Sequence, residues 1–159
     1  GRSLNQIRGR IVDCQNNGVI KGGHRAAGIC SRHEEGGDIV DCINYAKVTS
    51  DEWVAGGICS EVGMGNATLE SCVNMGEVSS TNIAGGIVGV ADIYNLTFSL
   101  SRCRHEGQVN STDIAGGVCG LVKKTDGILS MDSNTNSGTV NGVAGSETNI
   151  IGKDERISL

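Results

Sequence analysis

Seven cysteines carry the most reactive side chains of this chain, and they recur at regular intervals in two series. The first series is spaced by 28, 30 and 31 residues and contains Cys14, Cys42, Cys72 and Cys103. The second contains Cys30, Cys59 and Cys119. Such columns could form disulfide bonds, hold a metal ion or serve as small buried thiols.

Spacing and number favour the last of these three roles. Seven is an odd number, so complete pairing within the chain is impossible, and no Cys-x-x-Cys spacing indicates zinc. Neighbouring strands lie about 4.8 Å apart, whereas the Cβ atoms of a disulfide lie about 3.5–4.5 Å apart. We therefore predict reduced, buried thiols stacked turn on turn, with disulfide bonds as the alternative.

A column of amides follows the first cysteine series two residues later. Its members are Asn16, Asn44, Asn74 and Asn136, with His105 in the fourth copy. The column could be a polar binding stripe on the surface or an internal ladder of amides that bond along the stack. We predict the ladder, and we expect His105 to be a substituted ladder member rather than a catalyst.

The His-Glu-Glu triplet at 33–35 resembles the start of a metallopeptidase motif. The second histidine of His-Glu-x-x-His is missing, because position 37 is glycine. We predict that the triplet is solvated in a variable loop. Asp13, Asp38 and Asp41 could resemble the carboxylates of polysaccharide-cleaving enzymes. Their positions drift between copies, however, so we predict outward charge that keeps the protein soluble.

Two of the four aromatic residues of the chain lie in its longest loop, predicted over 90–98. Tyr94 and Phe98 are therefore the candidates for contact with a partner. The alternative is that they fold against the side of the protein as a small satellite core.

Composition limits the classes of function. The chain has 25 glycines and no proline, and its net charge of −5 includes no basic run, which argues against a nucleic-acid partner. No stretch of 18 apolar residues exists, so we expect no direct insertion into a membrane. We also expect no cofactor, no metal and a monomeric state.

An internal repeat predicts the fold. Five copies agree at five slots, and in each copy the slot three residues before the cysteine slot is apolar: Ile11, Ile39, Leu69, Leu100 and Met131. Within each copy several slots are two residues apart, which is the strand period. We predict an all-β, right-handed parallel β-helix (a β-solenoid) of about five rungs of 28–31 residues, with three strands per rung. A bend between the apolar slot and the cysteine slot would let both point inward.

The predicted boundaries follow the repeat. Residues 1–10 are predicted as an N-terminal lead-in or cap, residues 11–145 as the repeats, and residues 146–159 as a polar C-terminal cap or exit segment. Solenoid ends expose unpaired edges and need such covers.

Each of the first four copies also carries a second block, as in Ala55-Gly56-Gly57-Ile58-Cys59, which we predict as a further strand segment of the rung. This block resembles the GLUG repeat, which is named for Gly-Leu-aliphatic-Gly. The match reads Gly86-Ile87-Val88-Gly89 and Gly117-Val118-Cys119-Gly120, whereas the first two copies depart at the last position, with Ser31 and Ser60. Such repeats occur in bacterial surface and secreted proteins, including adhesin-like proteins and non-catalytic regions of immunoglobulin-A-cleaving metallopeptidases. The resemblance implies an extracellular or cell-surface setting.

The resulting expectation is a non-catalytic repeat module of a larger bacterial surface protein, acting in adhesion or as a spacer. Its partner would be a host or cell-surface protein or glycan. The alternative is a carbohydrate-active β-helix enzyme, either a hydrolase or a lyase. An exposed carboxylate pair with an aromatic platform would favour the enzyme, and a smooth repetitive flank would favour the module.

Overall fold

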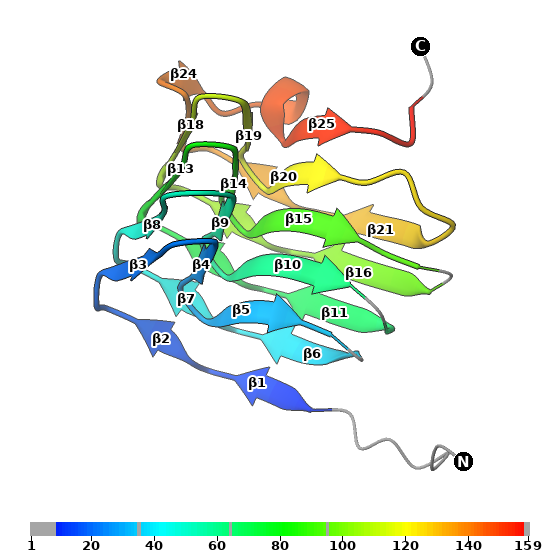
Figure 1. Ribbon diagram of the computed structural model, residues 1–159. Helices are drawn as coiled ribbons and strands as arrows, with labels where there is room; N and C mark the ends of the chain where they lie inside the picture. Colours follow the sequence, from blue (N-terminus) through cyan, green and yellow to red (C-terminus); the bar gives the residue numbers. More distant parts are fainter. Residues whose placement is uncertain (1–8, 35, 64, 95, 158–159) are drawn as a thin grey trace.

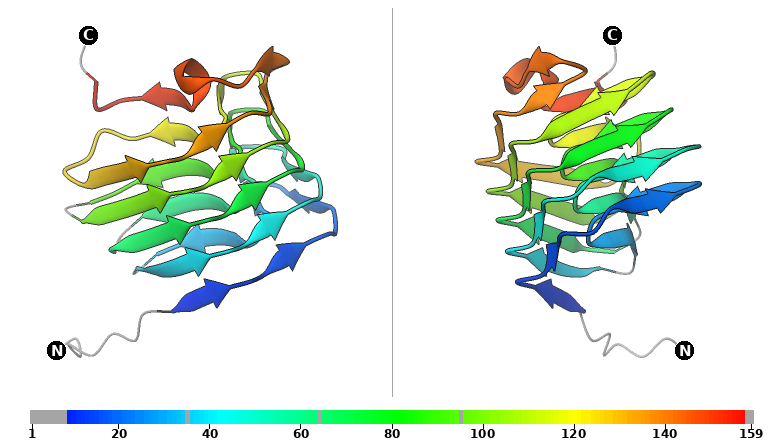
Figure 2. Two further views of the ribbon diagram at one scale, coloured as in Figure 1. Left: turned by 180° about the vertical axis from the view of Figure 1, so that it is seen from behind. Right: turned by 90° about the vertical axis from the view of Figure 1, so that its left-hand side faces the viewer.

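The computed structural model describes residues 9–34, 36–63, 65–94 and 96–157, which wind as a right-handed coil of about five turns (Figures 1 and 2). Residues that pair across one sheet in successive turns are 28, 30, 31 and 31 positions apart: Ile11, Ile39, Leu69, Leu100 and Met131. The prediction of a parallel β-solenoid with rungs of 28–31 residues is confirmed. Most of the predicted lead-in lies outside the described residues, and the first strand begins at Arg10.

The described residues form five sheets, which we name A to E in the order in which the chain passes through them. Sheet A contains β1 (Arg10–Val12), β6 (Gly37–Val40), β11 (Ala67–Glu70), β16 (Thr97–Ser101) and β21 (Ile128–Asp132). Sheet B contains β2 (Gln15–Asn16), β7 (Ile43–Asn44), β12 (Val73–Asn74), β17 (Arg104–His105) and β22 (Thr135–Asn136). Sheet C contains β3 (Ile20–Gly22), β8 (Val48–Ser50), β13 (Glu77–Ser80), β18 (Gln108–Ser111), β23 (Thr139–Val140) and β24 (Val143–Ala144).

Sheets D and E complete each turn. Sheet D contains β4 (Arg25–Ala27), β9 (Val54–Gly56), β14 (Ile83–Gly85) and β19 (Ile114–Gly116). Sheet E contains β5 (Cys30–His33), β10 (Cys59–Gly63), β15 (Val88–Asp92), β20 (Cys119–Val122) and β25 (Ile151–Asp154). The prediction of three strands per rung was wrong, because each full turn in the described residues has five. The Ala-Gly-Gly-Ile-Cys block is divided between β9 and β10 rather than forming one strand.

A left-handed residue makes the corner between sheets A and B in every turn. These residues have φ between 50° and 56°: Asp13, Asp41, Ser71, Arg102 and Ser133. Left-handed backbone turns the chain within one residue, so the apolar slot before the corner and the cysteine slot after it both point inward. Leu69 and Cys72 are accordingly buried on either side of Ser71. The predicted bend is confirmed, and two of the aspartates noted in the sequence, Asp13 and Asp41, are corner residues, whereas Asp38 lies within β6.

The asparagine column separates two parts of the interior. A large apolar cluster lies between sheets A and E and contains most of the buried cysteines, and a smaller cluster of valines and alanines lies between sheets C and D. Asn16 donates a hydrogen bond from Nδ2 to Oδ1 of Asn44 at 2.8 Å, and Asn44 donates in the same way to Asn74 at 2.8 Å. The structure thus places these amides in one ladder inside the coil.

Glycines at the corner between sheets D and E face the amides of Asn44, Asn74 and Asn136 in this ladder. A Cβ atom on Gly57 would lie 2.7 Å from Cγ of Asn74 and would also collide with the carbonyl of Gly86. Gly28 stands in the same relation to Asn44. The glycine of the repeat is therefore required because an amide and a neighbouring backbone fill the space of any side chain.

The C-terminal segment closes the last turn. Asn141 and Gly142 both have positive φ and form the tight turn that reverses the chain from β23 into antiparallel β24. A short 3₁₀ helix, η1 (Glu147–Asn149), follows, and β25 then pairs with β20 in parallel. The side chain of Asn149 accepts a hydrogen bond from Nδ2 of Asn136 at 2.6 Å, so the segment extends the amide ladder by one member.

His105 interrupts the ladder. Its Nε2 donates to the carbonyl of Thr139 at 3.2 Å, and its Nδ1 faces Nδ2 of Asn74 at 3.3 Å, where it can only accept. No hydrogen bond from His105 therefore reaches Asn136, whose buried Oδ1 has no partner among the described residues. Burial lowers the pKa of His105 below its ordinary value.

Replacing Gly57 with alanine should destabilise the protein strongly. We expect Gly57→Ala to lower the free energy of unfolding by about 3 kcal/mol. The added methyl group would collide with the carbonyl oxygen of Gly86 and with the side-chain amide of Asn74, and moving away from one of them does not relieve the collision with the other. Urea denaturation followed by circular dichroism measures this change. Gly18→Ala is the matched control, since its Cβ would meet nothing closer than Oδ1 of Asn16 at 3.9 Å. Equal losses in the two variants would contradict this explanation.

Restoring the amide at position 105 should stabilise the protein. His105→Asn places a donor below the unpaired Oδ1 of Asn136 and should add about 1 kcal/mol to the free energy of unfolding at pH 7. The effect should grow as the pH falls. The pKa of His105 is lower in the folded protein than in the unfolded chain, so the unfolded chain binds the proton more tightly. The wild type therefore loses stability as the pH falls below the ordinary histidine pKa of 6.5.

Denaturation curves of the wild type and His105→Asn between pH 5 and pH 8 test this prediction. His24→Gln is the control, because His24 is an exposed histidine that stacks on Trp53, outside the amide ladder. A stability difference between wild type and His105→Asn that stays constant across this range would show that His105 does not titrate as inferred.

Candidate functional site

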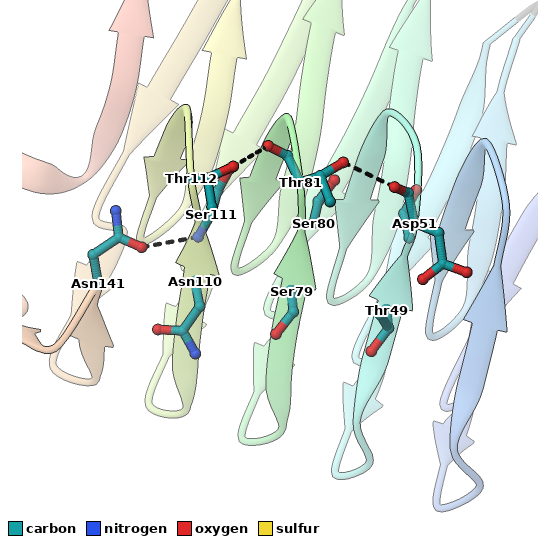
Figure 3. A pocket seen from close by; sticks show the side chains of 10 residues that line it. Thr49, Asp51, Ser79, Ser80, Thr81, Asn110, Ser111, Thr112 and Asn141 are labelled. Atoms are coloured by element: carbon teal, nitrogen blue, oxygen red, sulfur yellow. Dashed lines mark hydrogen bonds between the residues drawn. The ribbon is translucent and has the colours of Figure 1, made fainter.

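A shallow groove of about 360 Å³ on the flank of the solenoid runs across four turns at the outer side of sheet C (Figure 3). We call it the hydroxyl groove, because most of its side chains are hydroxyls. It is lined by Thr49, Ser50, Asp51, Ser79, Ser80, Thr81, Asn110, Ser111, Thr112 and Asn141.

Strand alternation produces the first row of the groove. Val48, Val78 and Val109 point into the core, so the next residue of each strand points outward. The outward residues are Thr49, Ser79 and Asn110, which pair in register across β8, β13 and β18. They are half-buried, and neighbouring members are separated by the strand spacing of about 4.8 Å.

A second row lies just beyond the strand ends, and its hydroxyl hydrogens hold successive turns together. Thr81 donates from Oγ1 to the carbonyl of Asp51 at 2.9 Å, and Thr112 donates to the carbonyl of Thr81 (Figure 3). Each hydroxyl uses its hydrogen inside the protein, so its remaining lone pairs can accept a hydrogen bond from a ligand. Asn141 ends the row, and its Oδ1 accepts from the backbone nitrogen of Ser111 at 2.8 Å.

The groove offers hydrogen bonds with little charge. Asp51 is its one ionisable lining residue, and Nζ of Lys21 lies 3.9 Å from Asp51 Oδ2. The polar chemistry available is therefore a repeated set of neutral donors and acceptors, set among the carbon atoms that make up most of the exposed lining. Such a surface suits an extended, uncharged ligand that carries many hydroxyl groups.

A second candidate lies in the elbow between sheets D and E, where charged side chains surround Trp53. We call it the Trp53 cluster, and its members are His24, Arg25, Trp53, Glu61, Asp92 and Lys123. The ring of Trp53 packs on an outer apolar cluster that includes Val54, Ile83, Val90 and Leu121. Glu61 and Asp92 are buried, at 7% and 8% exposure.

The groups of the Trp53 cluster already have partners within the protein. Arg25 donates from Nε to Glu61 at 2.8 Å, and its guanidinium lies 4.7 Å from the centre of the Trp53 ring. His24 stacks on the same ring, with 4.9 Å between ring centres. Lys123 donates to Oδ2 of Asp92 at 3.3 Å, which leaves Oδ1 as a buried atom without a hydrogen bond in the described residues.

The structure separates the two predicted contact residues. Tyr94 is exposed, at 54%, as a contact residue would be. Phe98 is fully buried in β16 and belongs to the main core, so its prediction as a contact residue was wrong. Strand alternation turns it inward beside Leu100. The predicted long loop is also shorter, because its two ends are parts of β15 and β16.

His33 also differs from its prediction. It ends β5 with 9% exposure instead of lying solvated in a loop. Its neighbour Glu34 forms an ion pair with Arg32, and position 35 lies outside the described residues. The histidine is therefore a part of the structured coil.

The cysteines stand in their two predicted columns. All seven are free, and five are buried; Cys14 is exposed and Cys30 is half-buried. The two exceptions belong to the first turn, which no other described turn covers on its N-terminal side.

Sequence reasoning missed both candidate surfaces. The hydroxyl groove has a sequence signal, since hydroxyl or amide residues follow the valine slot by one residue in three consecutive copies. The Trp53 cluster has none, because its members come from four turns and from several different slots of the repeat.

No protein-family model, curated protein or solved structure matches this chain. Among the described residues, no group of three or more histidine, cysteine, aspartate or glutamate side chains is placed to hold a metal ion. The same part of the chain contains no helix of the length and apolar character needed to cross a membrane.

Proposed function

We propose that this chain is a non-catalytic extracellular repeat module of a larger bacterial surface protein, and that it acts in adhesion through its hydroxyl groove. The observation that carries the proposal is the repetition of uncharged hydrogen-bonding side chains at the same outward positions of consecutive turns. Repeated equivalent positions suit a ligand that itself repeats. The resemblance to GLUG repeats of surface proteins supports the same setting.

The partner class that fits this groove is a neutral glycan. Glycan hydroxyls both donate and accept, as do Thr49 and the amide of Asn110, whereas Ser79 donates its hydrogen to Oε1 of Glu77 at 3.1 Å and offers its lone pairs as an acceptor. An acidic polymer would meet Asp51 and a chain of net charge −5, which disfavours its approach. A spacer role, in which the solenoid only separates other parts of a surface protein, needs no ligand and is the outcome if no glycan binds.

A carbohydrate-active enzyme is the second candidate, and the Trp53 cluster is the observation that favours it. Two buried carboxylates near an aromatic ring are the type of groups that glycoside cleavage uses. Against this role, Glu61 is bonded to Arg25, and Arg25 and His24 both lie on the Trp53 ring that a sugar would need. The cluster therefore supports structure better than turnover.

Binding should depend on the hydroxyl groove. We expect the chain to bind at least one of a soluble β-glucan, a mannan or a galactan in isothermal titration calorimetry. Thr49→Ala/Ser79→Ala should raise the dissociation constant about 30-fold, which corresponds to two lost hydrogen bonds of about 1 kcal/mol each.

The chain offers a matched control on another face. Thr68→Ala/Ser99→Ala removes the same two residue types from paired, half-buried outward positions of sheet A and should leave binding unchanged. Absence of binding to every neutral polysaccharide, or tighter binding to polygalacturonate or heparin, would contradict the proposed partner class.

The enzyme reading makes a separate prediction. Incubation with neutral and acidic polysaccharides should release no new reducing ends and no unsaturated products. If turnover is found, Glu61→Gln should be compared with Glu106→Gln, which changes an exposed glutamate. Turnover that only Glu61→Gln abolishes would overturn the non-catalytic proposal in favour of the enzyme.

A further inference from the structure

Three groups that could perform thiol chemistry meet at the first two strands of sheet E. Cys30 begins β5 and His33 ends it, and Cys59 begins β10 directly opposite Cys30 in the parallel register. Cys30 is half-buried, whereas Cys59 is fully buried and His33 is 9% exposed. The site therefore joins an accessible thiol to a sheltered thiol and an imidazole.

The imidazole is held in one orientation. Nε2 of His33 lies 3.1 Å from the carbonyl of Gly37, which can only accept, so Nε2 carries a hydrogen. The other ring nitrogen is left for the hydrogen bond that His33 makes with Cys30. Gly37 has φ of 126°, and a Cβ atom there would lie 3.2 Å from Cε1 of His33, so glycine allows this close approach.

These contacts favour a thiolate at Cys30. The hydrogen bond from the Cys59 thiol, and next the one from His33, lower the pKa of Cys30 to about 5 against the opposing effect of burial. Burial raises the pKa of Cys59 well above its ordinary value, so Cys59 keeps its hydrogen, for which the carbonyl oxygen of Glu61, 3.2 Å from Cys59 Sγ, competes with the Cys30 sulfur. The hydrogen bond to Cys30 raises the pKa of His33, and the charge of Asp38 acts in the same direction.

The other cysteines lack this combination. The hydrogen bond from the Cys72 thiol lowers the pKa of Cys103 in the same way, but both of these side chains are fully buried in inner turns and are not accessible to a solvent oxidant. Burial raises the pKa of Cys119 to about 12, and its paired neighbour in β15 is Val88 rather than a thiol. Cys14 is exposed, but burial raises the pKa of its neighbour Cys42 to about 11.

We propose that Cys30 and Cys59 form a peroxide-reactive dithiol, in which Cys30 is the attacking thiolate and Cys59 the resolving thiol. The Cys30 sulfur attacks hydrogen peroxide; an S–O bond forms, the O–O bond breaks, and the departing hydroxide takes a proton to become water. The Cys59 sulfur then attacks the Cys30 sulfur, the S–O bond breaks, and a second water leaves. Two thiols are oxidised to one disulfide, and one peroxide is reduced to two waters.

The position of β5 permits the second step. Paired strands lie about 4.8 Å apart, and a disulfide needs its Cβ atoms about 3.5–4.5 Å apart, so one strand must move slightly. β5 is the terminal strand of sheet E in the described residues and pairs only with β10, whereas β10 is held between β5 and β15. A small shift of β5 therefore breaks no pairing on its other side.

The pH dependence of alkylation tests the thiolate at Cys30. The rate of iodoacetamide reaction at Cys30, measured by peptide mass spectrometry, should change less than about twofold between pH 6 and pH 8, because the thiol is already ionised there. Glutathione, an ordinary thiol, should react about 100-fold faster at pH 8 than at pH 6. His33→Gln, which keeps a donor for Gly37, should move the Cys30 profile toward that of glutathione.

Peroxide treatment tests the pair itself. Equimolar hydrogen peroxide should give a Cys30–Cys59 disulfide in the peptide map, and Cys59→Ser should instead leave a sulfenic acid at Cys30 that dimedone traps. Cys14→Ser is the control and should still form the disulfide. A steep rise of the Cys30 alkylation rate from pH 6 to pH 8 would overturn the proposal. So would oxidation that joins Cys14 to Cys42, or dimedone labelling that persists in the wild type without a disulfide.

Discussion

Main-chain hydrogen bonding between turns in register is the constraint on which the rest of this structure depends. Because each strand pairs with its equivalent in the next turn, every side chain lies against its own counterpart at a spacing of about 4.8 Å. A slot can therefore hold only residues that stack on their own kind: aliphatic side chains, thiols, alanines or amides that bond to each other. This requirement produces the narrow range of residue types seen along the chain, with 25 glycines and only four aromatic residues in 159.

Register between turns restricts residue types not only within one column but also between columns that face each other across the coil, as the amide ladder and its facing glycines show. Asn44, Asn74 and Asn136 each span the narrow part of the interior and meet a glycine from the opposite corner, so the two slots are required together. A polar column inside the coil is stable because each amide donates to the next, and the cost appears where this sequence breaks. His105 leaves the Oδ1 atom of Asn136 unpaired, and the C-terminal Asn149 supplies a partner for the other atom of the same amide.

The same stacking decides where ligands and chemistry can act. Outward positions on consecutive turns form regular rows, and the hydroxyl groove is such a row with its hydrogens already used between turns. Groups that differ from turn to turn collect in the elbow around Trp53, where opposite charges neutralise each other. In the first described turn Cys30 is half-buried, whereas its paired neighbour Cys59 in the next turn is fully buried.

The sequence by itself determined the repeat, its length of 28–31 residues, the parallel coil and the stacked columns of cysteine and asparagine, because a slot repeated five times must contact its own copies. It also indicated the bend before the cysteine slot, since residues three apart cannot share one face of a strand. Only the tertiary structure decided that Phe98 is buried, that His33 contacts Cys30, and that Trp53 collects charges from other turns. These features depend on where the variable loop rejoins the coil and on contacts between residues in different slots, and the repeat does not encode either of them.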